Sequence, residues 1–275
     1  MDTIDILTTI VKEFPYALWG SILVGTICAF LGVYIVAKRV VFFGAVLTQV
    51  SVLGLAATFL PFIIIPHTVG SLAVTLVFAI PLSRLLTGKK IPRDAVLGTV
   101  FVTAIAARLL ILQKAHNVET AEIDNLLRGD ILFVTPDLFL LMAGAFVVAM
   151  VIHLLFFKEF MYISFDAETA RTQGFRADRW EMLFYVIAGG VISFATHMVG
   201  DIYVFGFLVI PPVAAMLLTR SVKRIFLYST LIGIFSPVVG LFLAFTFDLP
   251  SSPAIVAVAF AVLVIAWTVH SFRER

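Results

Sequence analysis

Residues 14–39 read FPYALWGSILVGTICAFLGVYIVAKR, an apolar run of 24 residues followed by two basic ones. An α-helix needs about 20 apolar residues to cross the roughly 30 Å hydrocarbon core of a bilayer. The stretch Phe14–Ala37 therefore predicts a transmembrane helix. Lys38 and Arg39 follow directly, and basic residues of this kind are typical of the cytoplasmic end of a span.

Further apolar runs of similar length fill most of the chain. Because 61% of the residues are hydrophobic and 13% are charged, the composition excludes an ordinary soluble domain. Two prolines, Pro211 and Pro212, lie inside one run and predict a packed, kinked helix there. We expect an all-α transmembrane bundle that forms a single domain over residues 1–275, with about nine spans. The eight further runs are Val41–Leu60, Phe62–Leu86, Ala95–Leu112, Leu138–Phe157, Met182–Gly200, Ile202–Leu218, Ile225–Phe247 and Pro253–His270.

Basic residues gather on one side when the nine runs alternate in direction. Of the 19 Lys and Arg residues, only Lys12, Arg108, Lys114 and Arg128 fall on the other side. The positive-inside rule makes the basic side cytoplasmic. We therefore expect the N-terminus outside and the C-terminus inside, which requires an odd number of spans. Since the basic clusters lie at span ends, anionic lipid explains them, and we expect no nucleic-acid partner.

The cytoplasmic loop 164–181 carries the most specific local signal. Its first part, SFDAETARTQG at 164–174, predicts a short helix. Asp166 and Glu168 suit the positive N-terminal end of a helix, and Gly174 can adopt the left-handed conformation that ends one. An isolated helix of this length is unstable in water, so it needs a surface to pack against. That surface is either a partner protein or the bilayer itself.

The stretch FDAETARTQG, followed by a span, resembles the coupling helix of type II ABC importer permeases. Three other stretches, Gly32–Ser51, Leu127–Leu138 and Val199–Ala215, resemble the zinc, manganese and iron uptake branch of that family. The resemblance covers Phe14–His270. It implies a homodimer in a prokaryotic cytoplasmic membrane, served by a cytoplasmic ATPase subunit and an extracytoplasmic solute-binding protein. It also implies contacts to the ATPase from Asp166, Ala167, Glu168, Ala170 and Gly174.

The second predicted span departs from that family's pattern. The family usually carries an Asp and, four residues later, a His, which face the transport pathway one turn apart. This chain has Ala45 and Gln49 at these positions. Alanine has no donor atom, and a neutral amide oxygen suits hard cations better than transition metals. Thr48, Gln49 and Ser51 could supply weak oxygen contacts along the pathway. The substrate is then either a divalent metal ion or an altered, non-metal one.

His197 and Asp201 are the candidate metal ligands elsewhere in the chain. They are four residues apart near the outer end of the sixth predicted span, so on one helix they would share a face. An imidazole and a carboxylate in this arrangement can bind a divalent cation. The alternative is that both residues are simply hydrated at the membrane boundary.

Several enzyme motifs are absent from the sequence. It contains no GxxxxGK[ST] phosphate loop and no HExxH, CxxC or GxSxG. We therefore expect a transport subunit that is not an enzyme and binds no cofactor, with ATP bound by the partner subunit. A self-contained secondary carrier is the alternative. The importer is favoured because no Asp or Glu lies at the centre of a predicted span, where a carrier places its coupling charges.

Overall fold

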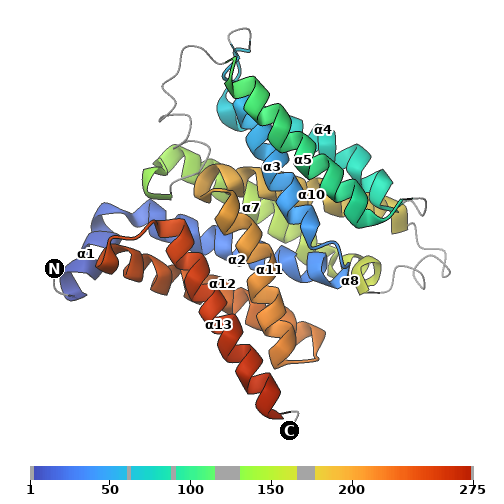
Figure 1. Cartoon of the computed structure of the whole chain (residues 1–275). Helices are drawn as coiled ribbons and strands as arrows, with labels where there is room; N and C mark the ends of the chain where they lie inside the picture. The colour runs from blue at the N-terminus through green and yellow to red at the C-terminus, as the bar shows by residue number, and fades with distance from the viewer. Residues whose placement is uncertain (1–2, 61–62, 88–90, 115–130, 166–176, 274–275) are drawn as a thin grey trace.

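The computed structural model describes residues 3–60, 63–87, 91–114, 131–165 and 177–273. All regular elements in these ranges are helices, and Figure 1 shows them as one bundle. In chain order they are α1 (Thr3–Glu13), α2 (Pro15–Ala37), α3 (Phe42–Ala57), α4 (His67–Thr87), α5 (Arg93–Leu112), the 3-10 helix η1 (Ile131–Phe133), α7 (Pro136–Leu155), α8 (Phe157–Phe165), α10 (Ala177–Val199), α11 (Asp201–Leu218), α12 (Val222–Phe247) and α13 (Ser251–Arg273).

Eight of the described helices are long and apolar enough to cross a membrane, which confirms the all-helical transmembrane fold. The second predicted span corresponds to α3, which is apolar but has 16 residues. At a rise of 1.5 Å per residue it reaches about 24 Å. The count of nine spans and the sides of the two termini stay predictions.

The N-terminal helix α1 was not expected from the sequence. It packs against α2 and α12, and its Ile10 is buried against Leu241. Helix α1 is therefore packed onto the bundle, against α2 and α12.

Helix α2 lies at the centre of the bundle, in contact with α10, α11 and α12 (Figure 1). Glycines allow the close approach. A Cβ atom at Gly25 would overlap the carbonyl oxygen of Gly233 in α12, and one at Gly32 would overlap the carbonyl oxygen of Leu208 in α11. Small residues at helix crossings are typical of membrane bundles, where dispersion contacts between closely packed backbones drive association.

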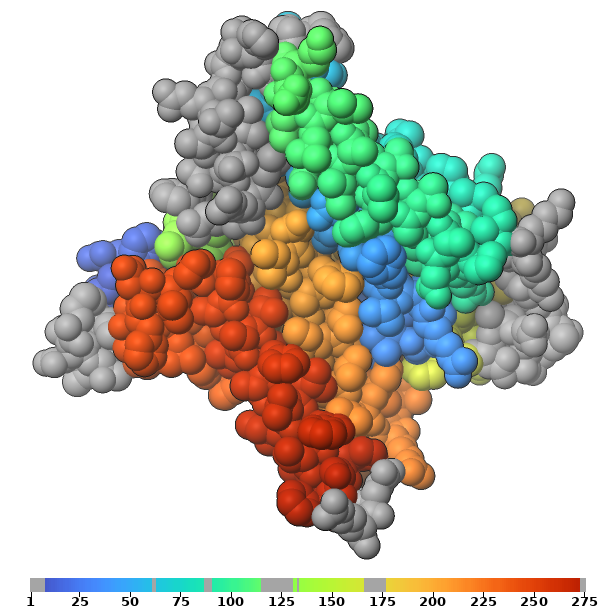
Figure 2. Space-filling model, in the orientation of Figure 1, coloured from blue at the N-terminus to red at the C-terminus, as the bar shows by residue number. Residues whose placement is uncertain are grey.

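Helix α11 is continuous over Asp201–Leu218, with Pro211 and Pro212 inside it. Both prolines are buried, which confirms a packed helix at this double proline. Figure 2 shows α11 in the middle of the visible face, between α3 and α5 on one side and α12 and α13 on the other. This position brings the start of α11 next to α3.

Candidate functional site

A polar network joins α3, α5 and α11. The amide Nε2 of Gln49 donates to Oδ2 of Asp201 at 2.9 Å, and Nη1 of Arg108 donates to Oε1 of Gln49 at 3.3 Å. All three residues are partly exposed, whereas the helices around them are mostly apolar. Through Gln49, the second predicted span therefore contributes a partly exposed polar group to this network.

The turn before α11 explains how Asp201 reaches this network. Gly200 has φ 84°, a left-handed conformation that glycine adopts at no steric cost. The chain turns there, and Asp201 becomes the first residue of α11. Its Oδ1 accepts a hydrogen bond from the backbone N–H of Ile202 at 2.8 Å. A carboxylate in the first turn is also favoured by the helix dipole.

The prediction that His197 and Asp201 share one helical face is wrong. Helix α10 ends at Val199 and α11 begins at Asp201, so Gly200 separates the two side chains into different helices. Nε2 of His197 lies 3.4 Å from Oγ1 of Thr68 in α4, while Asp201 bonds to Gln49 in α3. Among the described residues, no group of three or more His, Cys, Asp or Glu side chains could hold a metal ion. Metal binding by the pair stays a prediction.

Thr48 and Ser51, the other two predicted pathway residues, have their hydroxyl groups inside the subunit. Thr48 bonds to the carbonyl oxygen of Ala45, and both Thr48 and Ser51 are 1% exposed. Oγ of Ser51 lies 2.7 Å from that of Ser71 in α4, which lies 3.0 Å from that of Ser193 in α10. These serine hydroxyls link three helices, so Gln49 is the only partly exposed member of the predicted trio.

Two residues with polar roles were missed from the sequence. In the sequence Arg108 enters only the charge count, as a basic residue on the side opposite the basic clusters, but its guanidinium bonds to Gln49. Lys38 was used only for topology, but its Nζ forms a buried ion pair with Glu181 at 3.3 Å. Neither pairing has a signal in the sequence, because 59 and 143 residues separate the partners.

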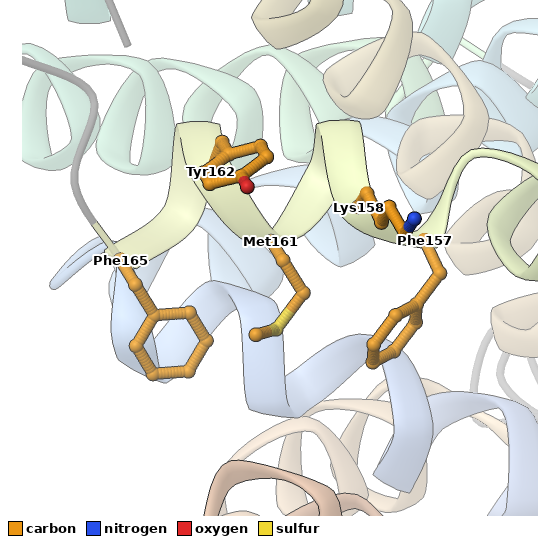
Figure 3. A pocket seen from close by; sticks show the side chains of 5 residues that line it. All are labelled: Phe157, Lys158, Met161, Tyr162 and Phe165. Atoms are coloured by element: carbon orange, nitrogen blue, oxygen red, sulfur yellow. The ribbon is translucent and has the colours of Figure 1, made fainter. Parts of the chain in front are cut away.

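Helix α8 presents an apolar cavity next to the predicted coupling loop. Figure 3 shows five side chains of α8 around it, and its volume is about 310 Å³. The lining residues are Phe157, Lys158, Met161, Tyr162 and Phe165. The predicted ATPase contacts Asp166, Ala167, Glu168, Ala170 and Gly174 follow α8 directly, but lie outside the described residues.

Comparisons with known proteins connect this fold to transport. The family model for the ABC 3 transport family matches residues 12–270. The chelated iron transport system membrane protein YfeC of Yersinia pestis is 27% identical over 248 residues, which are 88% of this chain and 83% of the relative. The manganese transport system membrane protein MntD of Bacillus subtilis is 28% identical over 256 residues, which are 86% of this chain and 85% of the relative.

A solved structure supports the same assignment of the fold. The structure of PsaBC from Streptococcus pneumoniae in complex with Fab matches with a TM-score of 0.83 at 22% identity. The match covers 96% of this chain and 95% of that one. Since the family model spans nearly the whole sequence and the fold agrees, the chain belongs to the ABC 3 transport family.

Proposed function

We propose that this chain is the membrane subunit of an ATP-driven importer of a divalent transition metal: zinc, manganese or iron. Membership of the ABC 3 transport family supports the importer, and the names of iron and manganese relatives support the metal. The observation that carries the proposal within this chain is the 2.9 Å contact between Gln49 and Asp201. It places a carboxylate against the span in which the family usually carries its ligands.

The network can form a weak site for a passing cation. Arg108 donates to Oε1 of Gln49, which leaves Nε2 directed at the Asp201 carboxylate. An incoming metal ion competes with this N–H for the carboxylate. Competition of this kind lowers affinity, and a transport site must release its ion as readily as it accepts it. Gln49 and Asp201 would therefore contact the metal ion in place of the stronger ligands that the family usually carries at the positions of Ala45 and Gln49.

The energy would come from a separate cytoplasmic ATPase. We place its docking site at the coupling loop, with contacts from Asp166, Ala167, Glu168, Ala170 and Gly174. The apolar surface of α8, which runs up to this loop, supports a docking surface there. The homodimer and the binding protein complete the proposed transporter. An outside N-terminus and an inside C-terminus put this loop on the cytoplasmic side.

A non-metal substrate is the second candidate, and two features favour it. Ala45 offers no ligand, and the guanidinium of Arg108 adds a positive charge beside Gln49. A bare cation is repelled by this charge, whereas an anionic or neutral solute is not.

Uptake into liposomes by the complex of this chain, its ATPase and its binding protein tests both candidates. We expect ATP-dependent uptake of zinc, manganese or iron and none of phosphate or glucose, an anionic and a neutral non-metal solute. Uptake of no metal would discard the metal assignment, and uptake without ATP would discard the importer in favour of a carrier.

A further inference from the structure

We propose that Lys38 is the positioning residue that transmits movement of the docking loop to the helix carrying Gln49. The inference rests on the proposed ATPase docking at the loop between α8 and α10. It is drawn from the place of one buried ammonium group, which contacts helices on both sides of that loop.

Lys38 binds to both flanks of the loop. Its Nζ donates to the carbonyl oxygen of Ile163 at 2.9 Å and pairs with Oε1 of Glu181 at 3.3 Å. Ile163 lies in the last turn of α8, which ends at Phe165, and Glu181 lies in the second turn of α10, which begins at Ala177. A force on the segment between these two helices therefore reaches the Lys38 side chain from either end.

The contact is shielded from solvent. The side chains of Lys38 and Glu181 are 4% and 6% exposed, and Nζ lies 5.7 Å from the ring centroids of Phe184 and Tyr185. A charge pair at this depth is screened little by salt, and its attraction is far stronger than at a surface. The link is therefore stiff.

Helix α8 cannot move independently of this link. Its Phe160 is fully buried among rings from three other helices. The ring lies 4.5 Å from that of His153 in α7, 6.3 Å from that of Tyr34 in α2 and 6.1 Å from that of Phe184 in α10. This packing makes α8, α2 and the start of α10 shift as one unit.

The connection continues to the site through α3. The ring of Tyr185 lies 4.7 Å from that of Phe43. Phe43 is six residues before Gln49 in α3, a rise of about 9 Å along the helix. Arg93, at the start of α5, also binds the backbone at Lys38, because its Nη1 donates to the carbonyl oxygen of Lys38 at 3.4 Å. A short chain of packed groups thus runs from the loop to Gln49.

Stability alone is a weak reason for a buried ion pair. The desolvation of both charges offsets much of their attraction, and an apolar or neutral pair of similar size is often as stable. Removing one partner, however, leaves an uncompensated buried charge and is strongly destabilising. Single and double substitutions therefore separate a role in folding from a role in coupling.

The test compares Lys38→Met, Glu181→Gln and the double variant, with Lys223→Met in the exposed first turn of α12 as the matched control. Three quantities are measured: the Tm of the purified chain, the ATPase rate of the complex, and the metal ions imported per ATP. Lys38→Met should lower Tm by about 5 °C or more, and the double variant should recover most of this loss. The control should match the wild type in all three.

The expected result is that both variants lacking Lys38 keep an ATPase rate within about threefold of wild type but import about tenfold less metal per ATP, a loss of about 1.4 kcal/mol in coupling. Wild-type import per ATP by the stable double variant would overturn the proposal. Failure of the double variant to regain Tm would also overturn it, because Lys38 would then serve the fold alone. Absence of uptake by the wild-type complex would instead count against the proposed function.

Discussion

Asp201 is the residue whose loss bears most directly on the proposed site, and the variant is Asp201→Ala. Its carboxylate accepts the 2.9 Å bond from Gln49 and the 2.8 Å bond from the Ile202 backbone. A hydrogen bond to a charged group contributes about 1.5–3 kcal/mol. If the metal ion replaces Gln49 at this carboxylate with similar energy, the concentration for half-maximal uptake should rise about ten- to a hundredfold.

The assay is the initial rate of metal uptake at increasing metal concentration, measured for a double-mutant cycle with Gln49→Ala. Gln49→Ala should have the smaller effect, because it removes a weak amide-oxygen ligand and also the N–H that competes with the metal ion for the Asp201 carboxylate, and these two changes oppose each other. The double variant should be no worse than Asp201→Ala alone, since the two side chains act together. Asp137→Ala is the matched control, because Asp137 is also an acidic residue in a first turn but is exposed.

Two outcomes would refute this reasoning. The first is that Asp201→Ala transports like the Asp137→Ala control, which would remove Asp201 from the pathway. The second is that the effects of Gln49→Ala and Asp201→Ala add, which would show that the two residues act independently.

Three further predictions concern packing, the outer end and topology. Gly25→Ala should cost about 1–3 kcal/mol by overpacking against α12, whereas Gly98→Ala, with open space around it, should be neutral or stabilising in a thermal melt. His197→Ala should raise the half-saturating metal concentration about tenfold if His197 is an entry ligand; an unchanged value would leave it only its contact with α4. Single cysteines at Thr3 and Ser271, in a chain without its native cysteine, should be labelled from opposite sides of the membrane, and labelling from one side would discard the nine-span topology.

The bundle itself could be predicted because bilayer thickness imposes a length on every span. Each predicted apolar run has a described helix at its place, with ends shifted by a few residues, as for Ala95–Leu112, which became Arg93–Leu112. The double proline was correctly interpreted as a packed helix, since buried backbone at Pro211 needs neighbours on every side.

The site could be predicted only in part. Gln49 was identified from its place in the family pattern, but its partners depend on how α5 and α11 pack against α3. The separation of His197 from Asp201 depends on the backbone conformation of Gly200, and a spacing of four residues carries no information about such a turn. The pairing of Lys38 with Glu181 depends on two distant helix ends, so no local pattern indicates it.

The central claim is that Gln49 faces the path of the metal ion, and the accessibility of a single cysteine tests it most directly. Gln49→Cys is made in a Cys28→Ala background, because Cys28 is the only native cysteine. Thr48→Cys is the control, since Thr48 is adjacent but 1% exposed. We predict that a water-soluble thiol reagent modifies the thiol at position 49 but not at 48, and that zinc slows the reaction at 49. Equal rates of modification at positions 48 and 49, or a rate at position 49 that zinc does not change, would contradict the account.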